Sequence, residues 1–169
     1  MKQKLFLAIT LAIACSFITK PFAYTLTAID LRGTVKATLE KSTAMIQTKG
    51  KTSTTSSSYM ISNPTSKVRV KIADAVFQSY SDQSTALLGP EDYISLYKLS
   101  SGKTGRSFTI NTDGTTNAAL LRITFTPTHV QINMITPAQG LIPGEYAFVD
   151  RSTTTTDGNI TVWTFGIDN

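Results

Sequence analysis

The chain has 169 residues with one cysteine, and its 16 basic and 11 acidic residues give a net charge of +5 at pH 7. Three lysines and Cys15 belong to the first 23 residues, and without that segment the charge falls to +2 and no thiol remains. Charge therefore gives no reason to expect a nucleic-acid partner, and a disulfide-stabilised fold and thiol chemistry are both excluded for residues 24–169.

The beginning of the chain is typical of a secretory signal peptide. Lys2 and Lys4 precede an apolar run from Leu5 to Ile18, and the small Ala23 provides a cleavage position before Tyr24. The run is too short to span a bilayer as a helix, and no later apolar run could do so. We therefore expect a signal peptide over residues 1–23 and a single exported domain over residues 24–169, located in the periplasm, at the cell surface or outside the cell.

Cys15 allows a second interpretation of this segment. Leu11 to Cys15 reads L-A-I-A-C and resembles a bacterial lipobox, where cleavage before the cysteine leaves a lipid-anchored N-terminus. Ala12 stands where leucine is usual, and apolar Phe17 and Ile18 follow where a polar tether is expected. A lipoprotein is therefore the less favoured interpretation.

The first part of the exported domain predicts strands joined by a polar loop. Residues 24–32 mix apolar and polar side chains and predict an N-terminal strand or an ordered lead-in. Residues 34–46 favour a strand because threonines alternate with apolar residues, although their Ala, Glu and Lys also suit a helix. Residues 48–58 are rich in Ser, Thr, Gly and Lys and predict an exposed, mobile loop.

Ser66 to Ile72 has the strict two-residue period of a half-buried strand. Its apolar residues are expected on one face and its basic residues, Lys67, Arg69 and Lys71, on the other. This basic stripe could bind an anionic glycan, lipopolysaccharide or a nucleic-acid backbone. Such a stripe is more often a solvated face, or a charged edge that prevents sheets from aggregating.

The middle of the chain predicts one short helical turn and several strands. Proline and acids at Pro90–Asp92 suit a helix start, and a strand follows over Tyr93–Leu99. Another short strand is expected over Arg106–Asn111. A hairpin is expected from the alternating segments Leu121–Phe125 and Val130–Met134.

The stretch from Leu141 to Asp168 carries the strongest pattern. Two runs rich in β-branched and aromatic residues flank a polar connection that contains Asp157-Gly158-Asn159, which predicts a β-hairpin. The only tryptophan, Trp163, shares a strand face with Phe165 and Ile167, and Tyr146 and Phe148 can meet them across the pair. We therefore expect Trp163 to anchor the core.

Seven to nine short strands, with turns about every 8–12 residues, predict an all-β fold. We expect a single antiparallel β-sandwich, immunoglobulin-like in general architecture.

Three stretches together resemble a group of exported bacterial proteins of unknown function. The first is Ser66 to Val70, and the second runs from Pro90 through I-x-L-Y-K-L to Arg106. The third is L-x-P-G-E-Y-A-F, which ends in F-G-I-D at Asp168. The resemblance implies a secreted or envelope β domain with a C-terminal Pro-Gly-Glu-Tyr-Ala hairpin, and it brings no catalytic residue.

No motif in the chain predicts an active site, a metal site or a cofactor. Fragments around Ser81, Ser95 and Lys103 imitate a serine β-lactamase, but they stand in the wrong order, and Ser95 and Lys98 fall on opposite faces of one strand. His129 is the only histidine, so no zinc site can be built around a histidine pair, and its place after a turn indicates a hairpin corner.

We therefore expect a non-enzymatic interaction or accessory module, with a protein or an envelope glycan as partner. A pilin-like structural subunit is the first alternative, although residues 24–31 make a poor donor strand. A hydrolase with an unrecognised site is the second.

Overall fold

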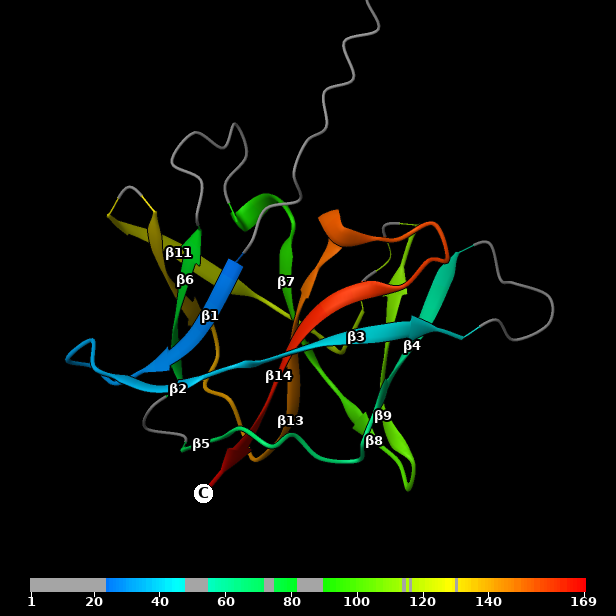
Figure 1. Cartoon of the computed structure of the whole chain (residues 1–169), viewed down its shortest axis with the longest axis horizontal. Coiled ribbons are helices and arrows are strands. Elements are labelled where there is room, and N and C mark those ends of the chain that lie inside the picture. Colours follow the sequence, from blue (N-terminus) through cyan, green and yellow to red (C-terminus); the bar gives the residue numbers. More distant parts are fainter. Residues whose placement is uncertain are drawn as a thin grey trace, which may run out of the picture.

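The computed structural model describes residues 24–47, 55–71, 75–81, 90–113, 115, 117–129 and 131–169. The predicted signal peptide lies outside the described residues. Within them the chain forms fourteen strands and two 3₁₀ turns and no α-helix (Figure 1). In chain order the elements are β1 (Tyr24–Ile29), β2 (Val35–Thr38), β3 (Glu40–Ile46), β4 (Ser56–Ser62), β5 (Arg69–Lys71), β6 (Val76–Ser81), η2 (Pro90–Asp92), β7 (Ile94–Lys98), β8 (Ser100–Ser101), β9 (Gly105–Asn111), β10 (Leu120–Leu121), β11 (Ile123–His129), β12 (Ile132–Pro137), β13 (Gly144–Asp150), η3 (Arg151–Thr153) and β14 (Ile160–Asp168).

The strands form two sheets. The first has five strands in the order β11-β12-β6-β1-β2. The second has the order β10-β7-β13-β14-β3-β4-β9-β8, with β5 added beside β14, and it curls into a half-barrel (Figure 1). The pairing of β5 with β14 is parallel, and the other described pairings are antiparallel. The prediction of an all-β fold with antiparallel sheets is confirmed.

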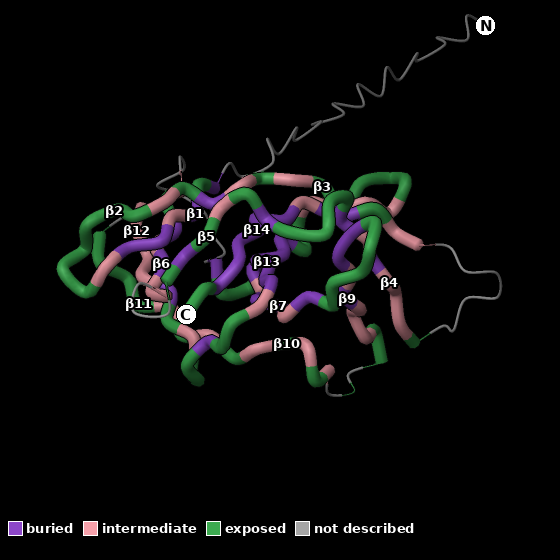
Figure 2. The backbone as a smooth tube through the Cα atoms, turned by 90° about the horizontal axis from the view of Figure 1, so that it is seen from below, coloured by how far each residue is buried: buried purple, intermediate pink, exposed green. Residues whose placement is uncertain are grey.

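The predicted C-terminal hairpin is present, and it lies within the curled sheet between β7 and β3. β13 and β14 pair with Phe148 opposite Trp163 and Tyr146 opposite Phe165. Trp163 is only 2% exposed, which confirms it as a core residue. Both strands are buried along nearly their whole length (Figure 2). Side chains alternate across a strand, so a strand buried on both faces must contribute to two separate cores.

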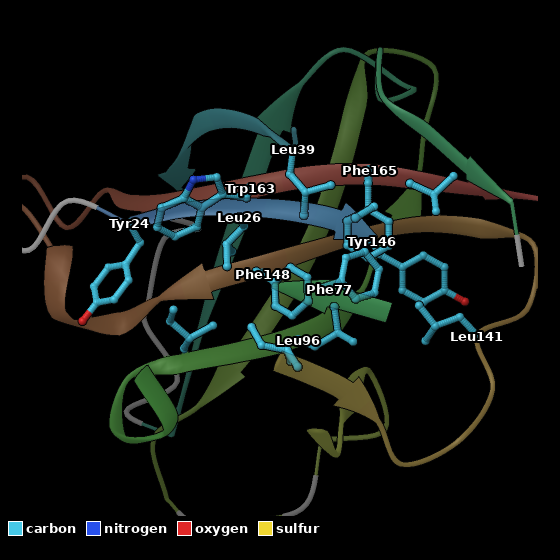
Figure 3. Close-up of a cluster of buried hydrophobic side chains, with 14 of the residues drawn as sticks. Tyr24, Leu26, Leu39, Phe77, Leu96, Leu141, Tyr146, Phe148, Trp163 and Phe165 are labelled. Carbon is cyan, nitrogen blue, oxygen red and sulfur yellow. The ribbon is translucent and has the colours of Figure 1, made fainter. Parts of the chain in front are cut away.

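The larger core fills the space between the two sheets. From the curled sheet it takes Tyr146, Phe148, Trp163 and Phe165, and from the five-stranded sheet it takes residues such as Phe77. The Phe77 ring lies 5.1 Å from that of Phe148 and 4.7 Å from that of Phe165, between centroids. Trp163 lies toward one end of this cluster and Leu141 toward the other (Figure 3).

The smaller core lies on the opposite face of the hairpin, inside the curl of the second sheet. Ala147, Val149, Ile160 and Val162 of the hairpin pack there against residues from the more distant strands of the same sheet, including Ala44, Tyr59, Ile61, Tyr97 and Phe108. The rings of Tyr59 and Phe108 stack at 5.3 Å. A sheet can enclose such a core only if it curls, so the apolar residues on this second face account for the half-barrel.

Two segments of the chain pass from one sheet to the other. β2 ends the five-stranded sheet and continues through Leu39 into β3 of the curled sheet. Leu39 is buried, and its N–H donates to the carbonyl of Leu26 at 2.8 Å. On the other side, β10 of the curled sheet continues through Arg122 into β11 of the five-stranded sheet. We call the segment Leu120–Ile123 the β10–β11 crossover.

Most of the predicted elements are confirmed. The N-terminal strand, the turn at Pro90–Asp92, the strand that follows it and the hairpin of β11 and β12 are all present. Residues 34–46 form strands rather than a helix, divided at Leu39 where the chain changes sheets.

Three predictions need correction. The described residues form fourteen strands rather than seven to nine, because several strands are only two to four residues long. The polar loop expected over residues 48–58 ends earlier, because Ser56–Ser58 begin β4 and pair with Thr109–Asn111 of β9. Residues 48–54 lie outside the described residues. The strand expected over Ser66–Ile72 is regular only over Arg69–Lys71, where it pairs with β14; Ile72 also lies outside the described residues.

Candidate functional site

The three basic residues of the predicted stripe have different surroundings. The side chain of Lys67 is 82% exposed and lies 3.8 Å from Glu40. Lys71 is exposed at the end of β5. Arg69 is engaged by carboxylates, because its guanidinium contacts both Glu145 and Asp168. The three residues therefore do not form a row of equivalent solvated cations.

Arg69 belongs to what we call the arginine–carboxylate cluster, made of Arg69, Arg106, Glu145 and Asp168. Glu145 is at its centre and is only 7% exposed. One of its carboxylate oxygens contacts Arg69, and the other accepts from Arg106 Nη1 at 2.9 Å and from the Ser66 N–H at 2.8 Å. Arg106, itself 2% exposed, also donates from Nε to the carbonyl of Asn63 at 3.1 Å. The cluster thus ties residues 63–69 to β9, β13 and β14.

The outer half of the cluster is open to solvent. Arg69 Nε donates to both oxygens of Asp168, at 3.1 and 3.2 Å, and the Asp168 side chain is 52% exposed. These hydrogen bonds lower the pKa of the Asp168 carboxyl, and together with Glu145 they raise the pKa of Arg69. Two arginines face two carboxylates, so the charges balance and no net charge is left for an external anion.

Gly166 makes room for this arrangement. The Arg69 guanidinium lies directly over it, and a Cβ built there would be 1.7 Å from Arg69 Nη1. The Gly166 N–H also donates to the carbonyl of Val68 at 2.9 Å. The cluster is therefore a structural clamp that holds β5 against β14.

A solvent-accessible groove lies beside the β10–β11 crossover. Its volume is about 700 Å³, within the range of small-molecule sites. We call it the crossover groove. It is lined by Lys98, Ala118, Leu120, Leu121, Arg122, Ala138, Gln139, Gly140, Leu141, Ile142 and Tyr146.

The local structure explains why the groove is open here. Lys98 stands at the end of β7, opposite Tyr146 of β13, and the Lys98 N–H donates to the carbonyl of Ala119 at 2.8 Å. Beyond Leu121 the chain leaves the curled sheet, and the carbonyl of Arg122 accepts from the Ala138 N–H at 2.9 Å. Between these two attachments the chain passes from one sheet to the other, and the groove borders the end of the larger core there, at the buried Leu141 and Tyr146.

Apolar side chains make up much of the groove wall. Leu120 and Ile142 are among the most exposed large apolar residues of the described chain, at 45% and 57%. Leu141 and Tyr146 belong to the larger core and form its end at this wall (Figure 3). The Tyr146 hydroxyl donates to the carbonyl of Ile142 at 2.7 Å, which holds the Ile142 segment in place.

The charged residues of the groove are all cations. Lys98 and Arg122 line it, and no Asp or Glu does. Neither cation forms an ion pair with another described residue. The groove therefore combines an apolar wall with positive charge that the described protein does not neutralise.

A second cavity of about 500 Å³ lies on the other side of the crossover. Leu120, Leu121 and Arg122 line both cavities, and Glu91, Ser95 and Asn117 add polar groups to the second. Its lining carries both signs of charge, so it differs in character from the crossover groove.

The residues considered for catalysis are not brought together. His129 is exposed at the end of β11 and lines neither cavity. Among the described residues no group of three His, Cys, Asp or Glu side chains could hold a metal ion. Ser95 lines the second cavity and Lys98 the crossover groove, consistent with their expected places on opposite faces of β7.

Sequence reasoning missed both the clamp and the groove. The Glu145 of the Pro-Gly-Glu-Tyr-Ala motif had no assigned role, and Arg106 was treated only as a strand residue. An isolated Glu and Arg within runs of buried strand residues could have indicated a buried ion pair. No similar sequence signal could have indicated the groove, because its walls come from three separate segments of the chain.

Comparisons with protein-family models, with curated proteins and with solved structures found no match to this chain. Among the described residues no helix is long and apolar enough to cross a membrane.

Proposed function

We propose that the protein is an exported, non-enzymatic binding module of the bacterial envelope or its surroundings, and that the crossover groove is its ligand site. The observation that carries this proposal is the groove itself, an open cavity of about 700 Å³ with exposed apolar side chains and two cations that lack a described acidic partner. Exposed apolar surface and uncompensated charge at one place are typical of binding sites. Export is supported by the basic and apolar N-terminal sequence.

The pilin-like alternative receives less support. A strand-exchange subunit needs a gap in its own sheet and a donor strand that leaves the domain. β1 is instead an internal strand, paired with β2 on one side and β6 on the other. Its apolar Leu26 and Ala28 are fully buried in the larger core.

The immunoglobulin-like arrangement is part of the same proposal. Two antiparallel sheets that face each other across the larger core support a sandwich of this general type. The curl of the second sheet and its smaller core go beyond that pattern.

A ligand screen with groove variants tests the binding function. The purified protein would be screened by thermal shift against small molecules and glycan fragments of the bacterial envelope. Ile142→Glu places an acid in the groove, and Leu31→Glu makes the same change at the β1–β2 turn, where Leu31 is 87% exposed. We expect a ligand that raises Tm in the wild type and in Leu31→Glu but not in Ile142→Glu, and that is recovered unchanged.

The proposal is overturned if no compound raises Tm, or if Ile142→Glu leaves every Tm shift intact. Conversion of the bound compound would instead establish an enzyme.

A further inference from the structure

We propose that the ligand of the crossover groove is a small amphiphile, with one anionic head group of the carboxylate or phosphate type on an apolar chain. This inference rests on the proposed function, since it concerns the same groove. It follows from the combination of positive charge and exposed apolar surface on the groove wall.

The head group is assigned by the two cations. Arg122 offers a planar fork of donors that suits a carboxylate or phosphate, and Lys98 adds a second positive charge to the groove lining. No acid lines the groove to compete for them. Elsewhere in the described chain, the basic residues Lys36, Arg69 and Arg106 each have a carboxylate partner. Lys98 and Arg122 have no carboxylate partner among the described residues, and unlike other such cations, for example Lys103, they line the crossover groove.

The chain of the ligand is assigned by the apolar wall. Leu120 and Ile142 remain exposed although they stand next to an extensive core. Leu121 packs against that core, and Leu141 and Tyr146 belong to it. An apolar chain in the groove would therefore continue the larger core outward and remove both exposed side chains from water, which is favourable in proportion to the area covered.

Each simpler ligand leaves part of the site unused. A small inorganic anion would satisfy the cations and leave Leu120 and Ile142 in water. A neutral hydrocarbon or alcohol would cover the apolar wall and bring two charges against a low-polarity ligand, which costs free energy. A cationic amphiphile would meet like charge. An anionic amphiphile satisfies both parts of the wall together.

Calorimetric titration of the purified protein with matched probes tests the ligand class. Decanoate and decyl phosphate carry the proposed features, decanol and decyltrimethylammonium keep the chain but change the head, and acetate and inorganic phosphate lack the chain. All are used below their micelle concentrations. We expect one or both anionic amphiphiles to bind at least tenfold more tightly than every other probe. Whichever of the two binds more tightly identifies a carboxylate or a phosphate head.

Variants connect the binding to the groove. Arg122→Gln and Lys98→Gln should each weaken the anionic amphiphile about tenfold, as expected for loss of one charge-assisted contact. Lys103→Gln removes an exposed cation outside the groove lining and should leave affinity unchanged. Circular dichroism and Tm of the three variants confirm that they are folded.

The outcomes separate this inference from the proposed function. Equal binding of decanol or decyltrimethylammonium, equal binding of acetate or phosphate, or insensitivity to Arg122→Gln and Lys98→Gln would each overturn the anionic amphiphile. If the screen still finds another ligand that Ile142→Glu abolishes, the binding function stands and only the ligand class fails. If no ligand depends on the groove, both fail.

Discussion

Glu145 illustrates how one side chain can secure several strands. It is nearly buried between Arg69 and Arg106, and it also accepts the Ser66 N–H. Replacing it with glutamine leaves Arg106 buried without a counter-charge. Breaking a buried pair in this way costs about 3–5 kcal/mol of unfolding free energy. We expect Glu145→Gln to show a loss of this size in urea denaturation.

Asp168 provides the matched control, because it binds the same Arg69 at the solvent-exposed edge of the cluster. Exposed ion pairs contribute about 0–1 kcal/mol. Asp168→Asn should therefore lower the unfolding free energy by no more than about 1 kcal/mol. Equal losses in the two variants would show that burial does not set the strength of this cluster.

Trp163 is the largest side chain in the larger core and is almost completely buried. Trp163→Ala should lower the unfolding free energy by about 3–5 kcal/mol, through lost burial and the cavity that remains. Because the chain has one tryptophan, the variant must be followed by circular dichroism. In the wild type, a blue-shifted emission protected from quenchers is expected. A loss below about 0.5 kcal/mol, typical of surface positions, would contradict the core assignment.

Asp30 stabilises the β1–β2 turn only while it is ionised. Its carboxylate accepts the N–H groups of Arg32 and Thr34 and lies 3.0 Å from Lys36 Nζ. The Thr34 hydrogen bond is the main cause that lowers its pKa from 3.8 to about 2. Because the pKa of Asp30 is lower in the folded state, the stability that its carboxylate contributes is fully present above its unfolded-state pKa. This stability is lost as the pH falls through about 2. Tm should therefore fall less steeply between pH 4 and pH 2 in Asp30→Asn than in the wild type. If Tm falls equally steeply between pH 4 and pH 2 in both proteins, Asp30 does not have this role.

At the scale of elements, the docking of β5 on β14 depends on a glycine. The three atoms nearest to a Cβ at Gly166 all belong to the Arg69 guanidinium. Gly166→Ala should therefore displace Arg69 from Glu145 and cost about 1–3 kcal/mol, as overpacking usually does. In an Arg69→Ala background the same substitution should cost much less. A double-mutant cycle measured by urea denaturation checks this, and additive losses would show that Gly166 and Arg69 act independently.

Elements with a complete local pattern could be predicted from the sequence. β13 and β14 carry alternating aromatic and β-branched residues on both sides of a turn, so the hairpin and the burial of Trp163 followed directly. β4 was missed at its start, because Ser56–Ser58 have a loop-like composition and become strand only by pairing with β9. The role of Arg69 was missed because its partner Glu145 lies 76 residues away.

The same reasoning explains why the candidate site could not be predicted. Lys98, Arg122 and Ile142 have unremarkable neighbours in the sequence. They line one groove beside the place where β10 ends after Leu121 and the chain passes to the other sheet. The position at which the chain changes sheets depends on how the two cores are packed. Local patterns in the sequence do not contain this information.

At the scale of the molecule, the hairpin of β13 and β14 separates two cores and contributes side chains to both. Side chains on both faces of these strands are therefore buried, and neither face of the hairpin is available to bind a partner. The crossover groove, where exposed apolar side chains lie beside two cations, is instead at the β10–β11 crossover, at the end of the larger core. The proposed binding site therefore lies at the margin of the sheets.

The proposed export predicts a specific N-terminus for the mature protein. Tyr24 begins β1, where it is buried, pairs with Ser81 and lies 5.4 Å from the Tyr93 ring. Cleavage before Tyr24 would give a domain that starts at its first strand. Cleavage before Cys15 would instead leave nine residues as a lipid tether, with a reach of roughly 30 Å when extended. Intact-mass measurement of the exported protein should give an unmodified chain that begins at Tyr24.

A Cys15→Ser variant gives an independent check on the same prediction. A lipoprotein needs the thiol of Cys15 for its lipid anchor, whereas ordinary signal-peptide cleavage does not use that side chain. We therefore expect Cys15→Ser to be exported, cleaved and distributed between soluble and membrane fractions as the wild type is. An acylated mass in the wild type, together with release of Cys15→Ser from the membrane fraction, would reverse the assignment and place the crossover groove on a protein tethered to the membrane.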